Sequence, residues 1–183
     1  FLYKFFKFFI IRFVCKYLKA DITHNRKLMK KIAISNGPLE TKKLATLFKA
    51  NLQKGDVVLL KGEIGAGKSH FARSLIQSAM YIKEEVPSPT FTLVQVYDTT
   101  IGSIWHADLY RLNDYSDVIE LGLIDAFGEE IVLLEWPERL GYLEPKDSLT
   151  IEIIILEGDR REIIFSTTSN EWKPRLDKIL KDQ

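Results

Sequence analysis

Residues 62–69 read GEIGAGKS, which is a complete match to the phosphate-binding loop pattern G-x-x-x-x-G-K-[ST]. Glycines adopt backbone angles that are closed to other residues, so successive amides of such a loop can curl around a phosphate. Lys68 would direct a positive charge toward the β- and γ-phosphate oxygens, and the Ser69 hydroxyl would be a ligand for the accompanying Mg²⁺. The loop therefore predicts a site for a nucleoside triphosphate.

Two carboxylates follow apolar runs and are candidate partners of this loop. A phosphate-binding loop needs an acidic side chain at the end of a neighbouring strand, to hold Mg²⁺ or to orient water. Glu135 ends the run IVLLE and resembles the acidic residue of a Walker B strand, whereas the alternative is an ordinary exposed strand end. Asp108 ends the run IWHAD, and the alternative for it is an N-cap of the next turn.

A hydroxyl and two imidazoles complete the candidate chemistry. Thr90 lies in the sequence SPTFT, at the distance from the loop where phosphate-sensing segments occur, and a γ-phosphate or Mg²⁺ could order it. The alternative is a turn shaped by proline. His70 and His106 lack the spacing of a metal cluster, which favours surface or supporting roles for both.

The segments around these residues alternate between strand and helix patterns. Asp56–Lys61 is a short apolar strand before the loop, and a helix begins at Lys68. The remaining strands are predicted at 32–35, 91–97, 103–107, 130–135, 149–156 and 161–167, with a turn at 98–102 and helices at 38–52, 117–127 and 171–180. The strands at 91–97 and 103–107 are predicted to pair as an antiparallel hairpin, as are the last two strands. This order predicts an α/β fold, a single P-loop NTPase-like domain with a central mixed β-sheet flanked by helices.

Composition is consistent with one domain. The chain has 183 residues, of which 46% are hydrophobic, so it can bury a core of its own but has little room for a second domain. A single cysteine, Cys15, supports neither a disulfide framework nor a zinc site, which favours a reducing compartment such as the cytoplasm.

The first 28 residues differ from the rest. The first twenty hold six of the 11 phenylalanines, and lysines or arginines interrupt the apolar residues, which is unlike a membrane span or a signal peptide. An amphipathic interfacial helix is one interpretation. We instead expect residues 1–28 to be an extension outside the native domain, which would comprise residues 29–183. Without that segment 19 basic and 24 acidic residues remain, a net charge of −5, which is unlike an autonomous nucleic-acid binder.

Beyond the phosphate loop, the ordered blocks SPTFTL (88–93), HADLYRL (106–112), ELGL (120–123) and LEWP (134–137) resemble the TsaE family, formerly YjeE. That family consists of small bacterial P-loop ATPases of tRNA threonylcarbamoyladenosine synthesis. The blocks DLYR and EWP are more specific than the loop itself. The resemblance covers Met29 to about Arg161.

The resemblance implies specific roles for residues of this chain. ATP phosphates would be contacted by Ile64, Gly65, Ala66, Gly67, Lys68, Ser69 and His70. Mg²⁺ would be bound by Ser69 and Glu135, and hydrolysis would be supported by Lys68, Asp108 and Glu135. Thr90 and Trp136 would also face the nucleotide. Of the two arginines in the turn at 158–161, Arg160 is preferred over Arg161 as the one that reaches the nucleotide. The adenine pocket would involve residues 38–41. The resemblance further implies TsaD and TsaB homologues as partners, with tRNA bound mainly by them and no membrane attachment.

Two other functions use the same loop. A small phosphotransferase would need arginines near the transferred phosphoryl group, for which Arg111, Arg139 and Arg160 are available. A nucleotide-sensing adaptor would need ATP binding without hydrolysis. A GTPase is disfavoured because no Asn-Lys-x-Asp motif follows to recognise guanine.

Overall fold

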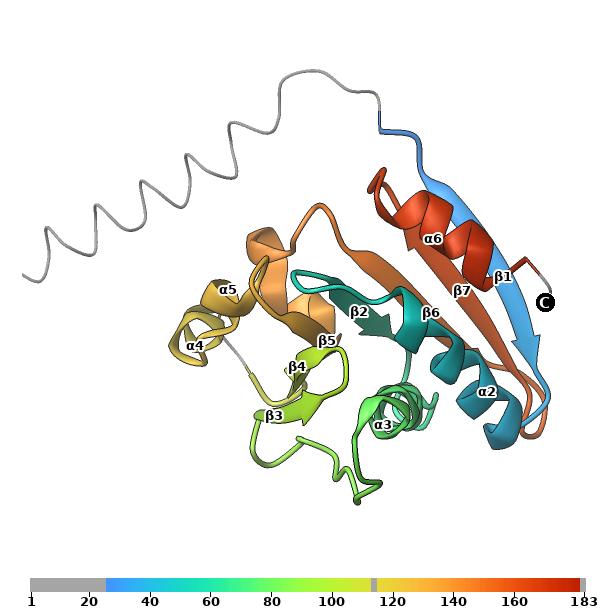
Figure 1. Ribbon diagram of the computed structural model, residues 1–183, viewed down its shortest axis with the longest axis horizontal. Coiled ribbons are helices and arrows are strands. Elements are labelled where there is room, and N and C mark those ends of the chain that lie inside the picture. The colour runs from blue at the N-terminus through green and yellow to red at the C-terminus, as the bar shows by residue number, and fades with distance from the viewer. Residues whose placement is uncertain (1–25, 113–114, 182–183) are drawn as a thin grey trace, which may run out of the picture.

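The computed structural model describes residues 26–112 and 115–181 (Figure 1). The elements of these residues, with η marking 3₁₀ helices, are β1 Met29–Ser35, α2 Pro38–Phe48, η1 Lys49–Asn51, β2 Val57–Lys61, α3 Lys68–Ala79, β3 Val94–Thr99, β4 Gly102–Asp108, α4 Tyr115–Glu120, α5 Leu123–Ala126, β5 Ile131–Glu135, η2 Pro137–Leu143, β6 Leu149–Ile155, β7 Arg161–Thr167 and α6 Trp172–Ile179.

The strands form one seven-stranded mixed sheet in the order β1-β7-β6-β2-β5-β4-β3. Strand β2 lies at the centre and pairs in parallel with β5 and β6, while β5 also pairs in parallel with β4. Two hairpins, β3–β4 and β6–β7, add antiparallel pairs, and β1 closes one side against β7. The prediction of an α/β domain with a central mixed sheet is confirmed, as are both hairpins.

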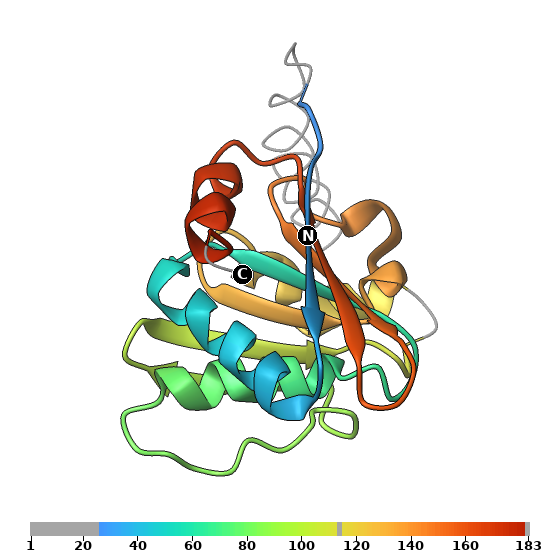
Figure 2. The same cartoon turned by 90° about the vertical axis from the view of Figure 1, so that its right-hand side faces the viewer.

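Helices cover both faces of the sheet centre, as Figures 1 and 2 show. Alternate residues of β2 enter different cores: Val58 and Leu60 face the helices α2, α3 and α6, whereas Val57 and Leu59 face α4, α5 and η2. Burial on both faces explains why β2 and β5 read as continuous apolar runs rather than as alternating patterns.

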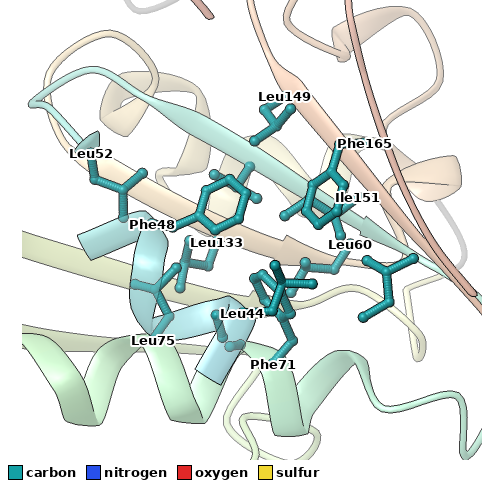
Figure 3. Packing of buried hydrophobic residues seen from close by; sticks show 14 of the residues in the cluster. Leu44, Phe48, Leu52, Leu60, Phe71, Leu75, Leu133, Leu149, Ile151 and Phe165 are labelled. Carbon is teal, nitrogen blue, oxygen red and sulfur yellow. The ribbon is translucent and has the colours of Figure 1, made fainter. Parts of the chain in front are cut away.

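The larger core lies between the sheet and α2, α3 and α6 (Figure 3). Phe48 of α2 is fully buried and stacks on Phe165 of β7 with ring centroids 5.4 Å apart, and it meets the edge of Phe71 of α3 at 5.8 Å. Leu75, on the same side of α3 as Phe71, is also fully buried. This packing fixes α3, and with it the helix start that follows the phosphate loop.

Two predicted helices are shorter than the sequence suggested. The prediction of one helix over 117–127 is wrong, because Gly122 adopts a left-handed conformation with φ of 72° and separates α4 from α5. The helix predicted over 38–52 ends at Phe48, and the next turn tightens into η1.

The strand predicted over 91–97 begins later than expected. The amide of Leu93 donates to the carbonyl of Pro89, and Leu93 has a positive φ of 65°, so this segment turns instead of pairing. The side chain of Phe91 is 86% exposed in that turn. At the other end β3 continues to Thr99, which pairs with Gly102, so the turn predicted over 98–102 is shorter than expected.

The register brings the ends of three parallel strands together. Glu135 at the end of β5 is paired with Leu60 of β2 on one side and with Asp108 of β4 on the other. The phosphate loop leaves β2 at the same end of the sheet.

Within the described residues no helix is long and apolar enough to cross a membrane. We predict that residues 1–28 are an extension of the domain. Residues 1–25 lie outside the described part of the chain, so this stays a prediction.

Candidate functional site

The phosphate-binding loop connects the central strand β2 to the first turn of α3. Gly62, Gly65 and Gly67 all have positive φ values, 139°, 80° and 112°, which side-chain-bearing residues rarely adopt. Position 62 has no room for a side chain, because a Cβ there would lie 2.4 Å from the carbonyl oxygen of Ile153 in β6. Gly67 is the N-cap of α3, so the amides after it point out of the helix start, where an anion is favoured.

Lys68 is the first residue of α3, and its side chain folds back over the loop. Its Nζ donates to the carbonyl oxygens of Gly62 at 2.7 Å and Glu63 at 2.9 Å. The same ammonium lies 3.8 Å from the ring centroid of Trp136. Burial lowers the pKa of Lys68 below its usual value, while the negative charges of Glu135, Asp108 and Glu138 act in the opposite direction. The amine is therefore held by weak acceptors in a desolvated place, where phosphate oxygens would compete well for it.

Ser69 and Glu135 are in direct contact across 66 positions of the chain. The Ser69 hydroxyl donates to Oε2 of Glu135 at 2.8 Å, so the first turn of α3 meets the end of β5. The other oxygen, Oε1, lies 2.9 Å from Nε2 of His106 in β4. Glu135 is only 1% exposed, which excludes the interpretation of a solvent-exposed strand end.

Asp108 ends β4 next to Glu135, and both of its carboxylate oxygens accept hydrogen bonds. Oδ2 accepts from the Thr90 hydroxyl at 2.8 Å, and Oδ1 accepts from the backbone amide of Tyr110 at 3.0 Å. Thr90 is also 2.9 Å from the Ser88 hydroxyl. Asp108 therefore does hold the next turn, as the alternative interpretation proposed, and at the same time it links the 88–93 segment to the strand ends.

Trp136 follows Glu135 directly and carries an unusual backbone conformation for a bulky residue, with φ of 60° and ψ of 53°. Its ring lies against Tyr110, with centroids 5.0 Å apart, and against the Lys68 ammonium. A left-handed conformation costs about 1–2 kcal/mol for a side-chain-bearing residue. Strain of this kind is typically found where function fixes a side chain.

Arg161, rather than the preferred Arg160, contacts the loop. Arg161 begins β7, and its Nε donates to the carbonyl of Ala66 at 3.0 Å. Its Nη1 donates to the carbonyls of Gly158 at 3.2 Å and Arg160 at 2.8 Å. The side chain of Arg160 is exposed at the hairpin turn, so its role toward a nucleotide stays a prediction. The preference for Arg160 came from the resemblance of the turn at 158–161 to a turn of the family, which does not reveal that the start of β7 lies beside the loop.

The remaining predicted residues lie around the start of α3. Nε2 of His70 is 2.9 Å from the carbonyl oxygen of Pro38, which places the imidazole beside the start of α2. The predicted adenine segment 38–41 and the loop helix are thus neighbours. Ile64 is 70% exposed at the loop tip, while Ala66 is buried.

The acidic residues suit Mg²⁺ better than a metal held by protein alone. No cluster of three or more His, Cys, Asp or Glu side chains with metal-binding geometry occurs in residues 26–112 and 115–181. Mg²⁺ is usually held by one or two protein oxygens together with substrate phosphates and waters. Ser69 Oγ and Glu135 Oε2, 2.8 Å apart at the loop, are such a pair and fit this ion.

Comparison with known proteins assigns the family. The sequence matches the family profile described as "Threonylcarbamoyl adenosine biosynthesis protein TsaE" over residues 35–163. The chain belongs to the TsaE family. The matched range contains the phosphate loop, Asp108, Glu135 and Arg161.

Individual relatives agree with this assignment. The chain is 37% identical over 138 residues to the tRNA threonylcarbamoyladenosine biosynthesis protein TsaE of Rickettsia felis, and the alignment covers 75% of this chain and 81% of that protein. It is 36% identical over 137 residues to the TsaE protein of Bacillus subtilis, with 74% and 85% covered.

A solved structure has the same fold. The crystal structure of YdiB from Bacillus subtilis matches with a TM-score of 0.72 at 28% identity, and the match covers 87% of this chain and 98% of that one. The resemblance to TsaE that the blocks beyond the phosphate loop indicated is therefore confirmed, and so is the fold. The TsaE family serves tRNA threonylcarbamoyladenosine biosynthesis.

Proposed function

We propose that this TsaE chain is the Mg²⁺-dependent component of the tRNA N6-threonylcarbamoyladenosine machinery that binds and hydrolyses ATP. Its target position would be adenosine 37, and it would act in the cytoplasm with TsaD and TsaB homologues. Its family membership supports the pathway, and the geometry of the site supports the chemistry.

One observation carries the chemical part of this proposal. The loop helix supplies Lys68 and Ser69, and the adjoining ends of β4 and β5 supply Asp108 and Glu135. Ser69 and Glu135 already touch at 2.8 Å, although the two residues belong to different elements. A phosphate loop joined to two strand-end carboxylates is the arrangement that nucleoside triphosphate hydrolysis requires.

Lys68 and the loop amides would bind the triphosphate. The Lys68 ammonium donates to two neutral carbonyl oxygens. Phosphate oxygens carry a negative charge that attracts the ammonium more strongly than a neutral carbonyl does, which favours exchange of these partners when ATP enters. The positive φ of Gly65 and Gly67 allows the loop amides to face the same anion.

The two carboxylates would divide the remaining work. Glu135 would share the ion with Ser69, and Asp108 would orient water through a carboxylate that Thr90 and the Tyr110 amide hold in place. When bound, Mg²⁺ neutralises charge that develops on the phosphate oxygens. Thr90 ties the 88–93 segment to Asp108, so ATP occupancy would be transmitted to that segment.

Partners would supply the contact with tRNA. The range 29–183 carries a net charge of −5, which is unfavourable for independent binding to a polyanion. Attachment to TsaD and TsaB homologues would bring the ATP site to the substrate without requiring a basic surface on this chain.

A binding and turnover experiment tests the ATP chemistry. Lys68→Ala and Glu135→Ala should both abolish hydrolysis, and Glu135→Ala should retain more ATP affinity because the lysine and loop amides remain. Lys83→Ala, at an exposed lysine, is the matched control and should leave both quantities unchanged. Transfer of the γ-phosphate to an added acceptor, with no release to water, would favour the phosphotransferase alternative instead.

A co-purification experiment tests the partnership. The purified chain is mixed with the TsaB and TsaD homologues of its own organism, with and without ATP, and the complex is measured by size-exclusion chromatography. We expect a complex that responds to ATP. Failure to form any complex would reduce the proposal to a generic ATPase.

A further inference from the structure

His106 is a buried imidazole with one polar contact. It lies in β4, its side chain is 0% exposed, and Nε2 is 2.9 Å from Oε1 of Glu135. The other ring nitrogen, Nδ1, is buried and has no hydrogen-bond partner among the described residues. An unpaired buried polar atom costs free energy, so packing alone does not account for a histidine here. A leucine or phenylalanine would fill an apolar place without that cost.

The position of His106 behind Glu135 follows from the sheet register. His106 is paired with Leu133 in β5, and two residues further along Asp108 is paired with Glu135. Residues two apart in a strand share one face, so His106, Asp108 and Glu135 project on the same side. Ile104 and Leu133 on that side belong to the core against α3, the helix that carries Ser69. The imidazole therefore lies between the apolar core and the carboxylate.

We infer that His106 is a positioning residue for the magnesium-binding carboxylate of Glu135. Its Nε2–H holds Oε1, so that Oε2 is left facing Ser69 and the phosphate loop. This inference rests on the proposed function, since it concerns the same ion, but it assigns a role to a residue outside the loop and outside the expected ligand set.

The hydrogen-bond pattern determines the direction of this contact. With the ring proton on Nε2, the imidazole donates to a carboxylate oxygen. With the proton on Nδ1, a nitrogen lone pair would face Oε1 and a buried N–H would lack an acceptor. The first tautomer satisfies the carboxylate and leaves only a lone pair unpaired.

Fixing the carboxylate matters because glutamate is long and flexible. Ordering such a side chain costs up to about 2 kcal/mol, and a structure that orders it beforehand removes that cost from ion binding. Ser69 alone leaves Oε1 free, whereas Ser69 and His106 together engage both oxygens. Mutation of a group that orients a metal ligand in this way typically lowers metal affinity 10–100-fold.

Two polar variants of similar size test the inference. His106→Gln places an amide N–H where Nε2 lies, whereas the shorter side chain of His106→Asn does not reach Oε1. ATP affinity is measured by calorimetry, once in EDTA and once across a Mg²⁺ titration. We expect His106→Asn to raise the Mg²⁺ concentration for half-maximal enhancement of ATP binding by about tenfold. His106→Gln should recover most of that loss, and neither variant should change ATP affinity in EDTA.

The outcomes separate this inference from the proposed function. Equal Mg²⁺ requirements for His106→Asn and the unmodified chain would overturn the inference, as would equal losses for Asn and Gln. If His106→Asn lowers ATP affinity by the same factor in EDTA as with Mg²⁺, His106 supports the fold of the site and not the Mg²⁺ ligand, which would also overturn the inference. Urea unfolding of both variants checks that they fold alike. If Mg²⁺ does not enhance ATP binding to the unmodified chain, the proposed function itself fails.

Discussion

Gly62→Ala should be the most damaging single-methyl change in the phosphate loop. The added Cβ would lie 2.4 Å from the Ile153 carbonyl oxygen and 3.1 Å from the Ala66 Cβ. Ile153 belongs to β6 and is paired with Ile163 of β7, so its carbonyl cannot easily move away. The loop would have to shift instead, and it carries Lys68 and the phosphate-binding amides.

The cost has two parts. Forcing an extra carbon into a well-packed place typically costs about 1–3 kcal/mol. Alanine at the φ of Gly62, 139°, adds about 1–3 kcal/mol, because this backbone region is sparsely populated by residues with side chains. The expected loss in the free energy of unfolding is therefore about 2–6 kcal/mol, a large part of the roughly 5–15 kcal/mol that stabilises a typical domain.

Gly158→Ala is the matched control. Gly158 also has a positive φ, 63°, but a Cβ there would meet nothing within 4 Å. It should cost only the conformational part, about 1–2 kcal/mol. Urea unfolding followed by tryptophan fluorescence measures both variants, and calorimetry measures their ATP affinity. Equal losses for the two variants, or normal ATP binding by Gly62→Ala, would refute the reasoning.

Three further predictions concern two charged groups at the site and one ion pair at the other end of β2. Arg161→Ala should weaken ATP affinity about tenfold because the Ala66 carbonyl loses a charged donor, and Arg160→Ala, measured by the same calorimetry, tests the alternative arginine. Burial lowers the pKa of Lys68 in the free protein, and bound phosphates would raise it. Between the pKa values of the free and the ATP-bound states, ATP binding therefore takes up a proton. ATP affinity measured across alkaline buffers should fall as the pH rises through that range. The guanidinium of Arg175 donates to both carboxylate oxygens of Asp56, at 2.6 Å and 2.8 Å. Arg175→Ala leaves that carboxylate unpaired, so urea unfolding should show a free energy of unfolding lower by about 3–5 kcal/mol. ATP affinity of the folded variant should be unchanged.

Local sequence patterns predicted the parts of this fold that depend on local physics. The apolar runs of β2 and β5 indicated buried strands, and the loop pattern placed the start of α3 at Lys68. The runs also end in the carboxylates Asp108 and Glu135, which the structure places side by side. Parallel strands of one sheet end at the same edge, so these residues could be grouped without coordinates.

Some features that the sequence did not reveal are local, and others depend on contacts between distant segments. The turn before β3 is local, since the amide of Leu93 donates to the carbonyl of Pro89, but its apolar residues resemble a strand in isolation. Arg161 reaches Ala66, 95 positions away, only because the β6–β7 hairpin lies beside the loop. The partnership of His106 with Glu135 likewise follows from the pairing of β4 with β5. Gly122 also carried a local signal, since glycine in a helix pattern indicates a possible break.

We propose that ATP hydrolysis at this site supports formation of threonylcarbamoyladenosine. The most direct test reconstitutes the reaction with the TsaB and TsaD homologues and tRNA, and quantifies the modified adenosine over several turnovers. We expect sustained modification with the unmodified chain and ATP, and loss of multiple turnovers with Lys68→Ala and with Glu135→Ala. Full modification with Glu135→Ala, in a variant shown not to hydrolyse ATP, would contradict the account and leave ATP binding alone as the function.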